Sequence, residues 1–164
     1  LDLPNGGVAV VVGNVIAQSA ATRNPALVSY GAEGTLWPEN RLLLAHNTLI
    51  STGRQAAWFA RAWRERLPAD TQVVTRNNLT VGPGVFNLGL GGDHRGDTAL
   101  TGPAPTPPDY ALPAASPLRG RVTAAEQDGE GLPAAEFAWP VGTRPLAAPA
   151  RWAPGAMQRH ASGN

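Results

Sequence analysis

The sequence predicts an all-β solenoid, a stack of similar coils made of short parallel strands. One short pattern occurs three times, with an aliphatic residue three positions before an Asn and another two positions after it. Asn14, Asn47 and Asn77 occupy the Asn position, at intervals of 33 and 30 residues. The 164-residue chain also contains 19 Gly and 16 Pro, and only 6% of it is aromatic. A fixed repeat with many turn residues favours a narrow aliphatic stack over a helical bundle.

Each repeated Asn is expected to bend the chain between two strands. Val, Leu and Ile on both sides suit pleated, buried strands. Asn tolerates the left-handed backbone region better than any residue except Gly. If successive coils bend at the same place, the Asn side chains can stack and hydrogen-bond to one another. We therefore expect Asn14, Asn47 and Asn77 to form a ladder, in a fold whose coils are stable only when stacked on their neighbours.

The strands can be placed in order along the chain. The expected strands are 7–13, 15–17 and 26–31 in the first coil, 41–46 and 48–51 in the second, and 72–76, 78–81 and 85–90 in the third. Loops are expected at 19–25, 32–40 and 91–97. Residues 7–90 should thus form about three coils.

Longer stretches of the chain resemble a known superfamily. The run from Asn5 to Leu49, NGGVAVVVGNVIAQSAATRNPALVSYGAEGTLWPENRLLLAHNTL, resembles bacterial right-handed parallel β-helix repeat proteins of the pectate-lyase-like superfamily. Asp109–Leu118, DYALPAASPL, is similar to the D-Y-x-L-x-x-x-S-P stretch that closes many such helices. Pro154–Gln158 is similar to an x-G-A-x-E ending, with Gln in place of Glu. The resemblance implies a right-handed parallel β-helix (solenoid) fragment.

The same resemblance bears on an ambiguous segment. The apolar residues between Gln55 and Leu67 can be drawn on one face of a helix. The comparison with β-helix proteins instead implies a strand over 57–62, followed by an irregular or briefly helical excursion through Arg66. We favour the strand.

The last third of the chain differs in composition, since eleven of the 16 prolines follow Thr101. We divide the chain into β-helix coils over 1–100 and an irregular, Pro-rich C-terminal wrap over 101–164. Its spaced apolar residues argue against a disordered tail and should pin it to the coils: Leu112, Val122, Phe137, Trp139 and Trp152. The last residues, 159–164, are expected to fray.

Composition excludes several kinds of function. The net charge is +1, so there is no general electrostatic case for binding nucleic acid or an anionic membrane. No Cys occurs, which excludes disulfides, Cys-ligated metals and thiol nucleophiles. No apolar run reaches the roughly 20 residues of a membrane span. A solenoid should start with a cap, so N-terminal coils of a longer parent chain, and any signal peptide, are expected before Leu1.

The resemblance also indicates where a ligand would bind. Enzymes of the superfamily hold long polysaccharides along one face of the stack, on the strands that correspond to 26–31, 57–62 and 85–90. Strand alternation then predicts an outward strip of Tyr30, Arg61 and Asn87, with Glu33 at the loop edge. These four residues are the candidate substrate-binding residues. For each of them, an ordinary solvated surface residue is the alternative.

The catalytic chemistry is not assigned to any residue. Eliminating a uronate needs a cation, which Arg61 could supply, and a base. No Lys occurs to act as the base, and His46 lies at the Asn bend, where Arg76 is expected to hold the equivalent place one coil on. Asp93 and Asp97 could hold Ca²⁺, although a loop salt bridge is the simpler interpretation. No other cofactor or metal is expected.

Three interpretations of function stay open. The chain could be the C-terminal part of a secreted polysaccharide-active enzyme, lyase- or epimerase-like, with its main catalytic residues in the missing coils and no activity by itself. It could instead be a non-catalytic carbohydrate-binding or surface-display solenoid, or a purely structural cap. The expected partner is a polysaccharide or oligosaccharide, and the expected location is secreted, cell-surface or periplasmic.

Overall fold

The computed structural model describes residues 1–53, 55–86, 89–102, 104–107, 110–123, 131–147 and 151–159. These residues form an all-β structure with one turn of 3-10 helix, η1 (Arg64–Arg66), and three sheets of four parallel strands. Sheet A contains β1 (Asp2–Leu3), β4 (Ala26–Tyr30), β7 (Ala57–Ala62) and β10 (Gly84–Val85). Sheet B contains β2 (Val8–Val12), β5 (Arg41–Ala45), β8 (Gln72–Arg76) and β11 (Asp93–Arg95). Sheet C contains β3 (Val15–Gln18), β6 (Thr48–Ser51), β9 (Leu79–Val81) and β12 (Thr98–Leu100).

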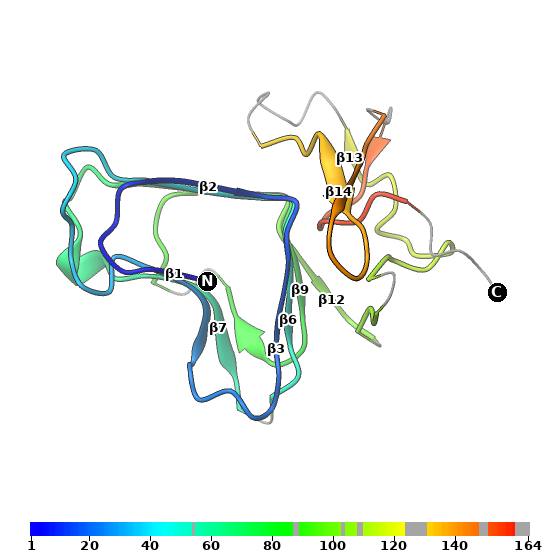
Figure 1. Cartoon of the computed structure of the whole chain (residues 1–164), viewed down its shortest axis with the longest axis horizontal. Helices are drawn as coiled ribbons and strands as arrows, with labels where there is room; N and C mark the ends of the chain where they lie inside the picture. Colours follow the sequence, from blue (N-terminus) through cyan, green and yellow to red (C-terminus); the bar gives the residue numbers. More distant parts are fainter. Residues whose placement is uncertain are drawn as a thin grey trace.

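The chain passes through the sheets in the order B, C, A and repeats that circuit. The complete circuits are β2–β3–β4, β5–β6–β7 and β8–β9–β10, which we call coils 1, 2 and 3. β1 adds one A strand before coil 1, and β11 and β12 add B and C strands after coil 3. Figure 1 shows the coils overlying one another. The stacked parallel sheets fit the expected solenoid-like β-helix.

The last strands of the stack differ from the expected ones. Residues 91–97 were expected to form a loop, but β11 pairs with β8, with Asp93 opposite Val74 and His94 opposite Thr75. The loop expectation is wrong because it rested on polar composition. The final layer of a stack lies close to solvent, where an Asp-His-Arg strand is tolerated. In the expected strand 85–90, β10 ends at Val85, and residues 87 and 88 lie outside the described part of the chain.

The expected ladder exists, but with Asn78 in place of Asn77. Asn47 Oδ1 accepts hydrogen bonds from Asn14 N (3.0 Å) and Nδ2 (3.3 Å). Asn78 Oδ1 accepts from Asn47 N and Nδ2, both at 2.9 Å. Asp97 Oδ1 ends the series, accepting from Asn78 N and Nδ2, both at 2.8 Å. A buried amide whose donors and acceptors are all paired joins each coil to the next.

The residue before each ladder position takes the left-handed backbone conformation. Its φ is 70° at Gly13, 50° at His46, 53° at Asn77 and 71° at Gly96. This conformation turns the chain from sheet B into sheet C, so Asn77 is the counterpart of His46. The expected equivalence of Arg76 with His46 is therefore wrong, and Arg76 pairs with Ala45. Asn77 Nδ2 lies 3.3 Å from His46 Nε2, so the corner residues also contact one another.

The core inside the coils is mainly aliphatic and continuous. It is formed by buried residues from all three sheets: Val11, Leu27, Val28, Tyr30, Leu42, Leu44, Leu49, Ala57, Phe59, Ala60, Ala62, Leu67, Val73 and Leu90. The expected strand over 57–62 is confirmed as β7, and η1 is the brief helical excursion that follows it. The helical alternative for this segment is wrong, because residues 57–62 pair as a parallel strand with β4 and β10.

The C-terminal wrap, described over parts of 101–159, covers the outer side of sheet C. Ile50, Leu79 and Val81 form a second buried cluster with Leu112 and Leu118 of the wrap. The wrap contains two antiparallel pairs, β13 (Val122–Thr123) with β16 (Arg151–Trp152), and β14 (Ala135–Phe137) with β15 (Thr143–Pro145). Figure 1 shows it beside the corner between β2 and β3. Sheet C is thus covered on both faces.

Most of the expected anchors of the wrap are confirmed. Leu112, Val122 and Trp152 are buried, and the Trp152 ring lies 5.4 Å from the His46 ring. Phe137 is half-buried. Trp139 is 52% exposed, so it is not a buried anchor; its ring contacts those of Tyr110 and Phe137 in the wrap.

One buried carboxylate organises the wrap. Glu136, on β14, is fully buried and accepts hydrogen bonds from Arg144 Nε (2.8 Å) and from the backbone N–H of Gln158 (2.9 Å). The Arg159 guanidinium lies 3.0 Å from the same carboxylate. Gln158 in turn accepts from Ala153 N at 2.8 Å. A single side chain therefore ties the β14–β15 hairpin to the C-terminal segment.

Candidate functional site

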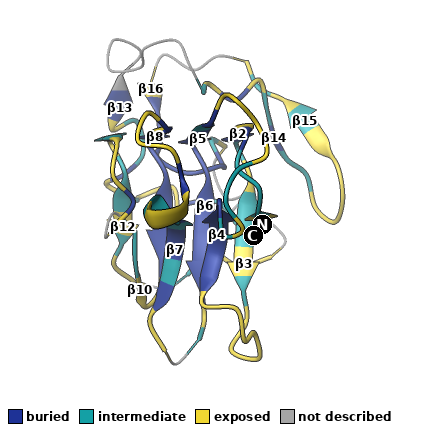
Figure 2. Ribbon diagram, turned by 90° about the vertical axis from the view of Figure 1, so that its left-hand side faces the viewer, coloured by how far each residue is buried: buried dark blue, intermediate teal, exposed yellow. Residues whose placement is uncertain are grey.

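The outer face of sheet A carries a row of residues aligned from coil to coil. Asp2 is opposite Ser29, and Ser29 is opposite Arg61. This register is set at the start of β7, where Trp58 N donates to Pro25 O at 2.7 Å. Figure 2 shows β4 and β7 side by side on this face of the molecule, with a short exposed helical turn in front of β7. Among the described residues of the predicted strip, Arg61 belongs to this row.

Arg61 lies between two tryptophans. Its guanidinium carbon is 3.5 Å from the centre of the Trp63 ring and 5.3 Å from that of Trp58. The Trp63 indole N–H donates to Ser29 Oγ at 3.2 Å, which holds the ring against the preceding coil. Cation–π stacking of this kind fixes the plane of a guanidinium. We call Trp58, Arg61 and Trp63 the Arg61 cluster.

Charged residues of η1 surround the Arg61 cluster. The Arg66 guanidinium carbon lies 5.4 Å from the Trp63 ring, and Arg66 also donates to Ala32 O. Glu65 approaches Arg61 Nη2 only at 4.0 Å, and both side chains are partly exposed. Such an exposed contact contributes little to stability and leaves the Arg61 donors accessible. Two guanidinium groups on one ring make this an attractive surface for an anion.

Of the other predicted site residues, Tyr30 does not face outward, whereas Glu33 lies in the loop after β4. Tyr30 was expected to face outward, but it is fully buried, is paired with Ala62, and donates its hydroxyl to Gly7 O at 2.5 Å. Burial raises the pKa of this phenol. The outward placement is wrong because the observed register aligns Ser29, one residue earlier, with Arg61. Glu33 is exposed in the loop after β4, and its N–H donates to Pro4 O at 2.8 Å.

The fourth predicted residue, Asn87, lies outside the described residues. Trp58 and Trp63, which support Arg61, were not predicted as site residues. Their signal was the spacing Trp-x-x-Arg-x-Trp, which places one ring three residues before Arg61 and the other two residues after it. In the sequence analysis, these tryptophans were considered only in deciding whether the segment is a helix or a strand.

The acidic residues near the end of the stack have other partners. Asp93 pairs with Arg76 at 2.6 Å and with Arg95 at 3.2 Å, and the hydrogen bond from Arg76 lowers the pKa of its carboxyl. Asp97 accepts from Asn78 and from Thr75 Oγ1. Burial raises the pKa of Asp97, although these hydrogen bonds oppose the shift. In the described part of the chain, no three His, Cys, Asp or Glu residues gather as metal ligands would.

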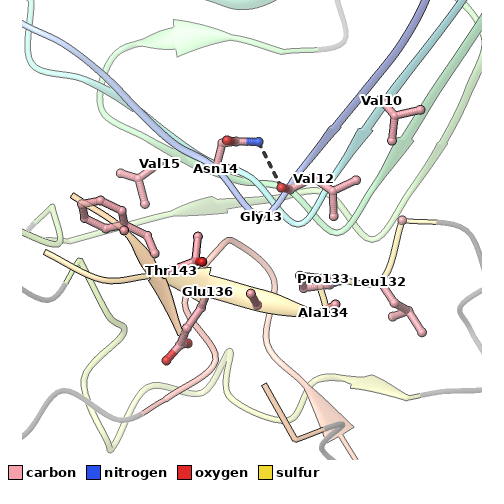
Figure 3. A pocket seen from close by; sticks show the side chains of 14 residues that line it. Val10, Val12, Gly13, Asn14, Val15, Leu132, Pro133, Ala134, Glu136 and Thr143 are labelled. Carbon is pink, nitrogen blue, oxygen red and sulfur yellow. Dashed lines mark hydrogen bonds between the residues drawn. The ribbon is translucent and has the colours of Figure 1, made fainter. Parts of the chain in front are cut away.

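A groove lies between the corner of coil 1 and the wrap. Figure 3 shows Val10, Val12 and Asn14 facing Leu132, Pro133 and Thr143 across an open groove. Of the residues that line it, only Glu136 is ionisable, and its carboxylate points away from the groove. The groove therefore offers no charged group to a ligand, in contrast to the Arg61 cluster.

Comparison with known proteins adds no family. No protein-family model matches the chain, and no curated relative or solved structure matches it. Within the described residues, no helix is both long and apolar enough to cross a membrane. The functional argument therefore depends on the geometry of the Arg61 cluster.

Proposed function

We propose that this chain binds an acidic polysaccharide on the outer face of sheet A, as part of a secreted right-handed parallel β-helix protein of the pectate-lyase-like kind. The stacked parallel sheets and the resemblance of residues 5–49 support the fold part of the proposal. One observation carries the binding part. The Arg61 guanidinium lies over the Trp63 ring and near the Trp58 ring, its side chain is partly exposed, and Arg61 is opposite Ser29 of the preceding coil.

The chemistry of this cluster suits a uronate. A guanidinium pairs with a carboxylate through two parallel N–H donors, and stacking on Trp63 orients those donors before the ligand arrives. Indole rings also offer flat apolar faces to the C–H side of a sugar ring, which Trp58 can supply. Arg66, 5.4 Å from Trp63, adds a second positive charge nearby. A neutral glycan would gain only the stacking contact.

The size of the face limits the affinity. Adjacent strands of a sheet lie about 4.8 Å apart, so three coils span about 10 Å. That length accommodates two or three sugar units. Weak binding by this chain is therefore expected. In a lyase- or epimerase-like reaction Arg61 would neutralise the uronate carboxylate, and the proposal assigns no catalytic base.

The test is a titration with uronate and neutral oligosaccharides of equal length. Arg61→Ala should weaken uronate binding about tenfold or more and leave neutral binding nearly unchanged. Arg61→Lys keeps the charge but not the planar pair of donors, so its affinity should lie in between. Arg23→Ala is the matched control, because Arg23 is an exposed arginine in the loop before β4. Equal uronate affinity of wild type and Arg61→Ala would remove this face from consideration.

A further inference from the structure

The outer face of sheet A carries two charges of opposite sign. Among the described residues of β1, β4, β7 and β10, the charged ones are Asp2 and Arg61. They lie in the same row, since each is opposite Ser29. Leu3 packs against the core, so Asp2, one residue earlier, faces outward and is exposed. From β1 to β7 the row therefore presents an acid, a hydroxyl and a cation.

The positive charge of this face is concentrated at one point. The guanidinium carbons of Arg61 and Arg66 lie 3.5 and 5.4 Å from the centre of the same Trp63 ring. Arg66 also donates to a backbone carbonyl of the preceding coil, so part of its donor set is already used. The Arg64 side chain donates to two other backbone carbonyls, at 2.9 and 3.1 Å. A ligand on this face therefore meets one place that attracts a carboxylate.

Carboxylates lie on both sides of that place. Glu65 Oε1 is 4.0 Å from Arg61 Nη2, and the Glu65 side chain is 61% exposed. Asp2 is two strands away from Arg61, which is about 10 Å at the usual strand spacing. The Leu1 ammonium donates to Leu27 O at 2.7 Å, along the hydrogen-bonding direction of the sheet, so it does not offset Asp2 on the outer face. The units that adjoin a bound uronate would lie beside Glu65 or Asp2.

From these observations we infer the class of glycan that this face selects: one in which units without an acid separate the uronates, in contrast to a run of consecutive uronates. The inference rests on the proposed function of the Arg61 cluster. Arg61 binds one carboxylate, whereas a second carboxylate on an adjoining unit meets Asp2 or Glu65. Two unit charges of like sign about 4 Å apart in water lower an affinity about fivefold. Asp2 and Glu65 thus determine specificity by repulsion.

Two tetrasaccharides test the inference, one made only of uronates and one in which uronate alternates with an N-acetylated hexosamine. The readout is an NMR titration of the Trp63 indole N–H in the intact protein at low salt. The alternating ligand should bind about threefold or more tightly than the all-uronate ligand, although it carries fewer charges. General attraction to a positive surface would give the opposite order. Equal or tighter binding of the all-uronate ligand would overturn the inference.

Variants assign the discrimination to the two acids. Asp2→Asn and Glu65→Gln should each raise the affinity for the all-uronate ligand about threefold, and more than the affinity for the alternating ligand. Asp70→Asn is the matched control, because it removes the same charge from the exposed turn before β8. A change no larger than that of Asp70→Asn, or an equal change for both ligands, would overturn the inference.

Arg61→Ala separates this inference from the proposed function. If Arg61→Ala weakens both tetrasaccharides while the wild type binds them equally, the proposed function stands and the inference is overturned. If Arg61→Ala weakens neither tetrasaccharide, both the proposed function and the inference are overturned. Weakening of both, together with a wild-type preference for the alternating ligand that Asp2→Asn and Glu65→Gln reduce, supports both.

Discussion

The coil stack and the C-terminal wrap are held together in different ways. In the stack the same hydrogen-bonded step recurs, from Asn14 to Asn47, to Asn78 and to Asp97. In the wrap one fully buried carboxylate, Glu136, accepts hydrogen bonds from the Arg144 side chain and from the backbone N–H groups of Gln158 and Arg159. A repeated contact spreads stability over neighbouring coils, whereas a single contact concentrates it. Removing one group should therefore have different consequences in the two regions.

The largest effect should follow from breaking the ladder in its interior. Asn47→Ala removes the Oδ1 that accepts from Asn14 and the Nδ2 that donates to Asn78 Oδ1 and Val11 O, in a fully buried position, and should cost about 3 kcal/mol of unfolding free energy. Chemical denaturation measures this cost. Asn40 is not a neutral control, since it is buried and accepts from Gly7 N at 2.8 Å. The exposed Asn24 is the better control. Equal midpoints for Asn47→Ala and Asn24→Ala would contradict the ladder.

A smaller and more local effect should follow from removing the carboxylate of the wrap. Glu136→Ala leaves Arg144 and Arg159 without their partner, but both are partly exposed, so a cost of about 2 kcal/mol is expected. Hydrogen exchange should show where the cost falls. The N–H of Gly155, bonded to Asn77 O, and that of Ala156, bonded to Thr48 Oγ1, should exchange faster. If the amides of the coils exchanged faster to the same extent as those of Gly155 and Ala156, the effect would not be local to the wrap, and the contrast between the two regions would be contradicted.

The first step of the ladder should be less sensitive than its interior. Asn14 is exposed and bonds to one neighbouring coil only, so Asn14→Ala should cost about 1 kcal/mol. The measurement is the same denaturation series used for Asn47→Ala. If Asn14→Ala and Asn47→Ala lowered the free energy of unfolding equally, burial of the Asn would not determine how much its ladder hydrogen bonds contribute to stability.

The smallest effect at neutral pH should come from Asp97→Asn, because Asn supplies the same acceptor oxygen. Burial raises the pKa of Asp97 above its ordinary 3.8. Its protonated form therefore stabilises the fold below pH 3.8, and this contribution is lost as the pH rises through the folded pKa. Relative to Asp97→Asn, the wild type should lose stability as the pH rises across this window.

Asp93 supplies the opposite sign as a control for that pH series. Its pKa is lowered by the hydrogen bond from Arg76, so its contribution is present above pH 3.8 and lost as the pH falls through the folded pKa. Relative to Asp93→Asn, the wild type should gain stability as the pH rises. If the stability of the wild type relative to each variant changed with pH in the same direction, the environments assigned to Asp97 and Asp93 would be contradicted.

Part of the fold could be predicted from residue pattern. The positions of Asn14 and Asn47 in the ladder and the strand over 57–62 were predicted correctly. The choice of Asn77 failed because two asparagines are adjacent and the flanking Val74 and Leu79 fit the pattern on the first. The true counterparts of Leu44 are Thr75 in coil 3 and His94 beyond it, so an aliphatic rule could not find them.

The candidate site was predicted in part. Arg61 was predicted to face outward, and its side chain is 31% exposed. Tyr30 was misplaced by one residue, because alternation predicts which residues share a face only after the register between strands is known. That register depends on a backbone hydrogen bond between residues far apart in the sequence, Trp58 N and Pro25 O.

The sequence by itself determined that this chain is an all-β stack bent at similar intervals, because aliphatic residues around an Asn recur 33 and 30 residues apart. Tertiary structure decided which of two adjacent asparagines is buried, which face Tyr30 occupies, and that Glu136 closes the wrap. The physical reason is the range of the interactions. Bends and strand alternation depend on neighbours along the chain, whereas register and the pairing of a buried carboxylate depend on residues brought together only by folding.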